Sequence, residues 1–195
     1  MKSITLKATV AVALVTLFGT AATFQSVSAD DISIRAIPGL KLITMQNQRS
    51  IKRLSVMTCK GRTVTMWGTS GGDYIVGTPG QDVIFAGAGN DRVDGRGGND
   101  IICGGKGNDT LNGNGGNDKI YGGQGHDTIN GNAGKDKLYG QAGEDRMYGG
   151  AGKDRLYGGT SYDSLNGGPG KDYLNGSVGN NGCDGGSGAD TLVNC

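Results

Sequence analysis

The sequence predicts an all-β fold, a parallel β-roll (a right-handed β-helix or solenoid) of about 14 nonapeptide repeats with a short N-terminal capping segment. Residues 68–193 divide into fourteen successive nonapeptides without an insertion. Glycine makes up 40 of the 195 residues and follows this period of nine, whereas collagen has a period of three. Each nonapeptide has a glycine-rich half followed by a short half that contains an apolar residue. These three observations carry the prediction.

Four of the nine positions are nearly constant along the repeats. Position 1 is glycine in thirteen repeats, with Ala86 as the exception, and position 4 is glycine in thirteen, with Ser161 as the exception. Position 6 is aspartate in thirteen repeats, with Asn181 in the other, and position 8 is aliphatic or methionine except at Cys183. We expect positions 1–5 to form a turn in which glycine permits positive φ, and positions 6–9 to form a short strand.

A four-residue strand with one buried side chain is not stable alone, so the repeats must stack. Two repeats then form one coil of eighteen residues with a strand on each side. Seven such coils place the position-8 side chains, from Ile75 to Leu192, in a single narrow core.

The position-6 aspartates predict bound cations. In the stacked coils, carboxylates two repeats apart lie about one strand spacing from each other, roughly 4.8 Å. A column of bare carboxylates at this spacing repels itself, and cations between the turns would relieve the repulsion. Carboxylates and turn carbonyls are hard oxygen ligands, which suit calcium better than magnesium.

The repeats resemble the GGxGxDxUx nonapeptide of the RTX, or haemolysin-type, calcium-binding proteins. The resemblance covers about two-thirds of the chain and implies several Ca²⁺ ions held between consecutive turns. Asn181 departs from the pattern, Ser161 weakens the loop of Asp163, and the first repeat makes a partial site. Carried over repeat by repeat, the implied calcium ligands are Asp73, Asp82, Asp91, Asp100, Asp109, Asp118, Asp127, Asp136, Asp145, Asp154, Asp163, Asp172 and Asp190.

Residues 1–29 are expected to be a secretory signal peptide. Lys2 and Lys7 precede an apolar run over 8–18 that is too short to span a bilayer, and small residues lead up to Ala29. Its removal takes two of the 19 basic residues and leaves 17 against 18 acidic ones, a net charge of −1. This balance does not favour a nucleic-acid partner. From the signal peptide we expect a secreted, extracellular protein without a membrane span after the signal is removed. We also expect it to be a monomer.

The other segments offer little for catalysis. Residues 30–58 are interpreted as a linker or small N-terminal segment, 59–67 as a degenerate capping repeat, and 194–195 as the C-terminal end. Residues 30–67 contain no histidine or glutamate and only two aspartates, Asp30 and Asp31. The single histidine, His126, occupies position 5, where other repeats carry Asn, Lys or Glu, so we interpret it as solvent-facing. We expect no catalytic residue and no organic cofactor.

Four cysteines in a secreted chain suggest two disulfides, for which three pairings exist. We favour Cys59–Cys103 and Cys183–Cys195, which would pin the two ends of the roll; free or intermolecular thiols are the alternative. A zinc site is not expected, because the cysteines are widely spaced and no histidine is near them.

The outward positions 7 and 9 suggest a second surface. In one sheet Lys119, Lys137 and Arg155 would form one column beside a column of tyrosines, namely Tyr121, Tyr139 and Tyr157. Such a face could grip an anionic cell-wall or matrix glycan, or its side chains could simply form ladders that stabilise the sheet.

Taken together, the sequence predicts a non-enzymatic, secreted calcium-binding protein that folds on meeting extracellular calcium and has a structural or adhesive role. Its layout resembles small secreted calcium-binding repeat proteins of actinobacteria. Classical relatives carry a toxin, protease or lipase domain before the repeats. The alternatives are therefore a glycan-binding module that uses the Lys/Tyr face, or an accessory module of a secreted hydrolase or toxin.

Overall fold

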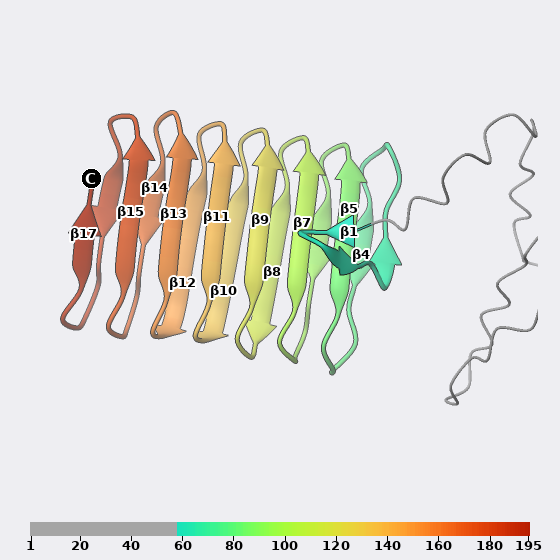
Figure 1. Ribbon diagram of the computed structural model, residues 1–195, viewed down its shortest axis with the longest axis horizontal. Coiled ribbons are helices and arrows are strands. Elements are labelled where there is room, and N and C mark those ends of the chain that lie inside the picture. Colours follow the sequence, from blue (N-terminus) through green and yellow to red (C-terminus); the bar gives the residue numbers. More distant parts are fainter. Residues whose placement is uncertain (1–57) are drawn as a thin grey trace, which may run out of the picture. The chain divides into compact units, whose positions relative to one another are not determined.

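The computed structural model describes residues 58–195, and the regular structure of this part is entirely β-strand (Figure 1). The expected signal peptide and residues 30–57 lie outside the described residues. Among residues 58–195, no helix is long and apolar enough to cross a membrane. The prediction of an all-β roll is confirmed.

Two parallel sheets form the two layers of the roll (Figure 1). The seven-stranded sheet consists of β4 (Tyr74–Val76), β6 (Arg92–Asp94), β8 (Thr110–Gly115), β10 (Thr128–Gly134), β12 (Arg146–Gly152), β14 (Ser164–Asn166) and β16 (Gly182–Asp184). The eight-stranded sheet consists of β3 (Met66–Trp67), β5 (Val83–Ala88), β7 (Ile101–Lys106), β9 (Lys119–Gln124), β11 (Lys137–Ala142), β13 (Arg155–Thr160), β15 (Tyr173–Val178) and β17 (Thr191–Val193).

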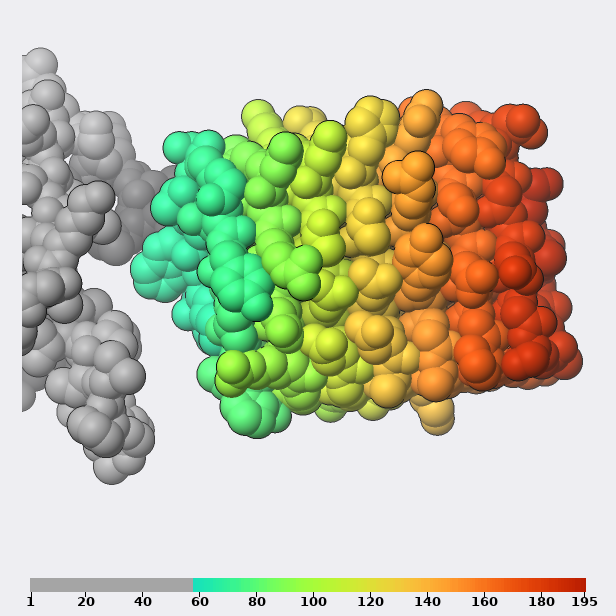
Figure 2. Space-filling view, turned by 180° about the vertical axis from the view of Figure 1, so that it is seen from behind, coloured from blue at the N-terminus to red at the C-terminus, as the bar shows by residue number. Residues whose placement is uncertain are grey.

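The register repeats every eighteen residues, because each strand pairs in parallel with the strand two repeats away. Ile129 of β10, for example, lies between Leu111 of β8 and Met147 of β12. The chain therefore alternates between the two sheets and completes one coil every two repeats. Successive coils appear as bands of changing colour along the roll in Figure 2.

The position-8 side chains of both sheets form the core between the layers. From Ile84 to Leu174 these side chains are at most 1% exposed. Each buried aliphatic side chain of this size contributes about 1.5–3 kcal/mol to stability. Met66 and Ile75 pack against the core near its N-terminal end and Cys183 near its C-terminal end. Leu192, in the last repeat, is 49% exposed.

Most strands of the two sheets are longer than the sequence predicts, whereas β3, β4, β6, β14, β16 and β17 have only two or three residues. Strand β9, for example, runs from position 7 of one repeat to position 3 of the next, rather than over positions 6–9. Its inward side chains alternate, so that Gly122 at position 1 points to the same interior as Ile120 at position 8. The first glycine is therefore part of the strand in β9.

The backbone turns at positions 2 and 4 use the left-handed region. Gly105 and Gly107 have φ values of 117° and 118°, and Gln141 has 85° at position 2. Ser161, which replaces glycine at position 4, adopts a φ of 88°. A left-handed conformation costs a non-glycine residue about 1–2 kcal/mol, so the Ser161 turn carries local strain.

The capping segment divides into two parts. Met66 of β3 pairs with Ile84 and packs against the core. Residues before it form an antiparallel hairpin of β1 (Thr58–Cys59) and β2 (Arg62–Thr63) that lies on the outer face of the eight-stranded sheet, across β5 and β7 (Figure 1). There Cys59 and Val64 are buried against Val83 and Ile101. The hairpin thus covers apolar residues outside the roll.

Two disulfides join segments within the described residues. Cys59 is bonded to Cys103 of β7, with Cα atoms 6.0 Å apart, and ties the hairpin to the sheet. Cys183 of β16 is bonded to Cys195, with Cα atoms 5.5 Å apart. No cysteine of the described residues is free.

Candidate metal sites between the coils

The position-6 aspartates form two columns, one from the odd repeats and one from the even repeats. In each column the backbone N–H of one aspartate donates to Oδ1 of the aspartate eighteen residues later. The N–H of Asp109 donates to Oδ1 of Asp127 over 2.9 Å, and that of Asp127 to Oδ1 of Asp145 over 2.8 Å. This bond links each coil to the next. It orients each carboxylate toward the aspartate of the preceding coil.

Most of these carboxylates are buried, and their second oxygen lacks a partner. Asp73 and Asp190, at the two ends, are half-buried. Eleven aspartates are at most 4% exposed: Asp82, Asp91, Asp100, Asp109, Asp118, Asp127, Asp136, Asp145, Asp154, Asp163 and Asp172. In ten of them, from Asp91 to Asp172, the buried Oδ2 accepts no hydrogen bond. Leaving one buried polar atom unsatisfied costs about 1–3 kcal/mol, and more if it is charged, so each of these oxygens requires a cation or a proton.

In eight of the ten repeats with an unpartnered oxygen, that Oδ2 and a backbone carbonyl oxygen border the same position-1 glycine. A Cβ built on Gly149 would lie 2.7 Å from Oδ2 of Asp154 and 2.6 Å from the carbonyl oxygen of Gly167, one coil further on. The same holds at Gly167, with Oδ2 of Asp172 at 2.7 Å and the carbonyl oxygen of Gly185 at 2.6 Å. At Gly149 and Gly167 the carboxylate occupies the space that a side chain would need. Ala86 is the one position-1 residue that carries a Cβ. In these repeats two acceptor oxygens thus lie beside the same glycine.

Asn181 shows what such a pair of acceptors needs. Its Oδ1 accepts the N–H of Asp163 over 2.9 Å, as an aspartate would. Its Nδ2 occupies the place of Oδ2 and donates to the carbonyl oxygens of Gly179 and Asn194 over 3.4 and 3.2 Å. In this repeat the amide N–H group of Asn181 donates to the carbonyl oxygens, so no cation is needed. The ten repeats with an unpartnered Oδ2 have no such donor.

The first two repeats satisfy their carboxylates by another device. Oδ2 of Asp73 accepts from the backbone N–H and the hydroxyl of Thr69, over 2.6 and 2.9 Å. Oδ2 of Asp82 accepts from Thr78 in the same way, over 2.7 and 3.0 Å. Threonine occurs at position 2 only in these two repeats. The sequence analysis missed this feature, although the two threonines were its signal.

Burial destabilises the ionised form of the carboxylates when no cation lies beside them. Desolvation raises the pKa of Asp109, Asp136 and Asp145 to about 7, and that of Asp100 and Asp154 to about 6. The accepted backbone hydrogen bond lowers each pKa, and neighbouring carboxylates in the column raise it further. A cation beside the carboxylates would reverse this effect by stabilising the charged form.

The available ligands are oxygen atoms. Within residues 58–195, no group of three or more His, Cys, Asp or Glu side chains could hold a metal ion by itself. A metal between the coils would therefore combine carboxylates with backbone carbonyls. Calcium accepts such mixed oxygen sets in flexible geometry, whereas zinc prefers nitrogen and sulfur. The residues present thus fit calcium.

His126 is exposed, but it belongs to a hydrogen-bond ladder. Its backbone N–H donates to Oδ1 of Asn108 over 2.9 Å, and its Nδ1 accepts the N–H of Glu144 over 2.9 Å. Asn99 and Asn117 make the equivalent bond over 2.7 Å in the even repeats. An asparagine or histidine side chain at position 5 therefore links neighbouring loops on the surface of the roll.

Comparison with known families agrees with this geometry. Six overlapping or adjacent segments match the RTX calcium-binding nonapeptide repeat: residues 67–102, 104–129, 121–156, 130–165, 148–183 and 157–192. Comparison with curated proteins finds no matching relative. Because the matches span 67–192, the chain belongs to the RTX calcium-binding nonapeptide repeat family, whose repeats bind several calcium ions on a non-catalytic β-roll.

Proposed function

We propose that this RTX-repeat protein is a secreted structural or adhesive protein that folds when it binds extracellular calcium. The observation that carries the proposal is the set of buried Oδ2 atoms that accept no hydrogen bond. We assign calcium to these ten carboxylates: Asp91, Asp100, Asp109, Asp118, Asp127, Asp136, Asp145, Asp154, Asp163 and Asp172. Asp190, at the C-terminal end, would contribute a partial site.

The energetics explain why folding would depend on calcium. Without cations, two columns of buried carboxylates oppose the stacking of the coils. With calcium at ten times its dissociation constant, each independent site adds about 1.4 kcal/mol to the stability of the folded state. Ten such sites would add about 14 kcal/mol, which matches the whole stability of a typical domain. Extracellular modules bind calcium at roughly 10⁻⁴–10⁻³ M, so the chain would remain unfolded at intracellular calcium levels.

Secretion is supported by the disulfides and by the N-terminal sequence. Cys59–Cys103 and Cys183–Cys195 would persist in an oxidising compartment. The charged and apolar segments of residues 1–29 have the pattern of a cleaved signal.

The test is far-UV circular dichroism of residues 30–195, with the disulfides intact, during a calcium titration. The expected result is a cooperative gain of β signal with calcium and none with magnesium at the same concentration. A chain that is already β-rich in chelator would show that core and disulfides suffice, and would overturn calcium-driven folding.

Binding of a glycan through the Lys/Tyr face is the second candidate. The rings of Tyr121 and Tyr139 stack with centroids 4.8 Å apart, and those of Tyr139 and Tyr157 with centroids 5.0 Å apart. Because the rings cover each other's faces, this arrangement favours a ladder that stabilises the sheet over a platform for sugar rings. A pull-down on cell-wall polysaccharide with the three tyrosines changed to serine tests the point. Unchanged binding would exclude the tyrosine column.

A further inference from the structure

Six basic side chains form two adjacent columns along the face built by the even repeats. At position 7, Lys119, Lys137 and Arg155 are direct neighbours in β9, β11 and β13. At position 5, Lys135, Lys153 and Lys171 follow one another in the loops that precede β11, β13 and β15. All are exposed except Lys137, which is half-buried. We call these six residues the basic double column.

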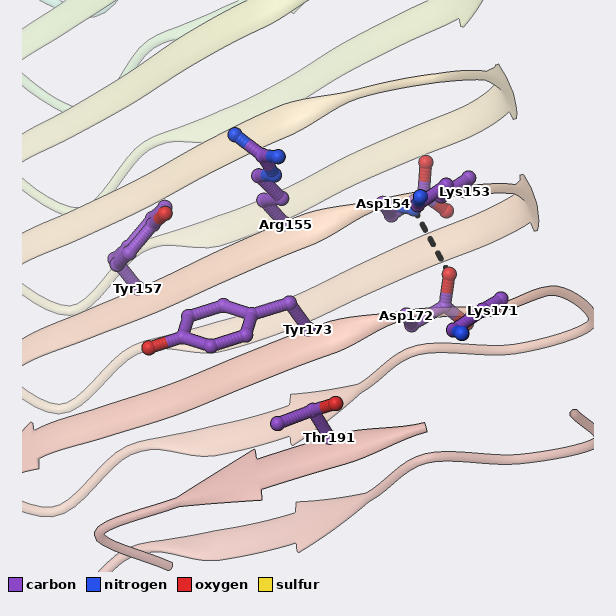
Figure 3. Close-up of a pocket in the computed structure, with 8 residues that line it drawn as sticks. All are labelled: Lys153, Asp154, Arg155, Tyr157, Lys171, Asp172, Tyr173 and Thr191. Carbon is purple, nitrogen blue, oxygen red and sulfur yellow. Dashed lines mark hydrogen bonds between the residues drawn. The ribbon is translucent and has the colours of Figure 1, made fainter. Parts of the chain in front are cut away.

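The two columns border a pair of successive hollows. One hollow is lined by Lys135, Asp136, Lys137, Lys153 and Arg155. The next is lined by Lys153, Asp154, Arg155, Tyr157, Lys171, Asp172, Tyr173 and Thr191 (Figure 3). Since neighbouring strands of a sheet lie about 4.8 Å apart, the positive charges repeat at nearly this interval along the roll.

Asp136, Asp154 and Asp172 lie between the two columns, but their Oδ2 atoms accept no hydrogen bond from the basic side chains. Oδ1 of Asp172 accepts the backbone N–H of Asp154 over 2.8 Å, the bond that is dashed in Figure 3. Oδ2 of Asp136, Asp154 and Asp172 is buried and accepts no hydrogen bond. The carboxylates therefore face the interior of the roll, while the basic side chains remain available at the surface.

The opposite face shows that the fold does not require this charge. At position 5 of the odd repeats stand Asn108, His126, Glu144 and Tyr162, and at position 7 stand Thr110, Thr128, Arg146 and Ser164. That face carries one acidic and one basic side chain over the same length and forms an equally regular sheet. Like charges on neighbouring strands destabilise a sheet. The even face thus bears a cost in stability that its neutral counterpart avoids.

We propose that the basic double column binds a linear acidic polysaccharide, one that bears carboxylate or sulfate groups, laid along the axis of the roll. The regular spacing of the charges matches an extended chain with repeated anionic groups better than a compact ligand. Lysine and arginine supply charge-assisted hydrogen bonds to such groups. The tyrosine hydroxyls of the neighbouring ladder offer further polar contacts at its edge. This inference rests on the proposed extracellular location of the folded roll, but not on the number of calcium sites.

The experiment measures binding of fluorescein-labelled heparin and hyaluronan by anisotropy, with neutral dextran as the control polymer. Calcium is kept at about 2 mM, above the dissociation constants of roughly 10⁻⁴–10⁻³ M that are typical of extracellular modules. Heparin carries sulfate and carboxylate groups and hyaluronan only carboxylates, so the two arms separate the sources of negative charge. The test variant is Lys135→Gln with Lys153→Gln. The matched control is Arg92→Gln with Arg146→Gln, which removes two charges from the opposite face.

We expect the test variant to lose roughly tenfold in affinity and to reduce the salt dependence of binding by about two released ions. The control variant should bind within about twofold of the unmodified protein. Equal losses in both variants, or no binding of either acidic polymer by a folded roll, would overturn the inference. Circular dichroism at the same calcium concentration separates this outcome from failure of the chain to fold, which would instead contradict the proposed function.

Discussion

Oδ2 of Asp82 accepts two hydrogen bonds from Thr78, one from its backbone N–H over 2.7 Å and one from its hydroxyl over 3.0 Å. In Asp100, the next aspartate of the same column, Oδ2 is buried and has no donor. Two carboxylates in equivalent positions thus differ in whether their second oxygen has a donor. If calcium binds through oxygens without a donor, it should bind at Asp100 and not at Asp82.

Substitution of these aspartates should change the calcium stoichiometry unequally. Asp118→Asn replaces an unpartnered oxygen by an amide and should remove at least one bound ion. Asp82→Asn should leave the number of bound ions unchanged, because Thr78 already satisfies that carboxylate. Isothermal titration calorimetry with calcium measures both numbers. Equal losses in the two variants would contradict the distinction.

Asn181→Asp is the reverse experiment. The change removes the Nδ2 donor to the carbonyl oxygens of Gly179 and Asn194 and leaves an acceptor in its place. We expect one additional bound calcium ion and a calcium-free state destabilised by about 1–3 kcal/mol. Equilibrium dialysis gives the stoichiometry, and chemical denaturation at graded calcium concentrations gives the stability. An unchanged stoichiometry would argue against a site at this position.

The calcium-free roll should gain stability on acidification. Burial raises the pKa of Asp109, Asp136 and Asp145 from 3.8 to about 7, so the folded state binds more protons than the unfolded state between these values. Stability from these groups is complete below about pH 4 and is lost as the pH rises through about 7.

Circular dichroism of calcium-stripped protein from pH 4.5 to 8.5 should therefore show more β structure at the acidic end. Calcium affinity should move in the opposite direction, because protons compete for the same carboxylates. A calcium-free chain that is more folded at pH 8 than at pH 5 would refute the expected sign.

A methyl group at Gly149 should disrupt the candidate site of Asp154. In Gly149→Ala the new Cβ would lie 2.7 Å from Oδ2 of Asp154 and 2.6 Å from the carbonyl oxygen of Gly167, closer than such contacts allow. Overpacking of this kind costs about 1–3 kcal/mol, which corresponds to a fall of roughly 3–10 °C in Tm in calcium. Gly71→Ala is the control, because nothing lies within 4 Å of its added Cβ. Differential scanning calorimetry of both variants should separate them clearly.

The sequence predicted the stacking well, because the period of nine continues through residues 68–193 without an insertion. When identical nonapeptides stack in parallel, each position lies against the same position two repeats away, so Ile129 must meet Leu111 and Met147. The sequence did not predict the position of the hairpin. Cys59 and Val64 cover the outer face of β5 and β7 because Val83 and Ile101 are apolar there. This contact joins segments that are distant in the sequence, and it does not follow from the nine-residue period.

The sequence by itself determined the period, the eighteen-residue coil, the position-8 core and the columns of aspartates. Only the tertiary structure decided which carboxylate oxygens lack a donor and which position-1 glycines lie against a carboxylate. It also showed that Thr78 supplies a donor to Asp82 and that the amide of Asn181 is itself a donor. The physical reason is that stacking follows from repetition along the chain. Whether a buried oxygen is satisfied depends instead on individual donors and carbonyls that the turns and neighbouring coils bring to it.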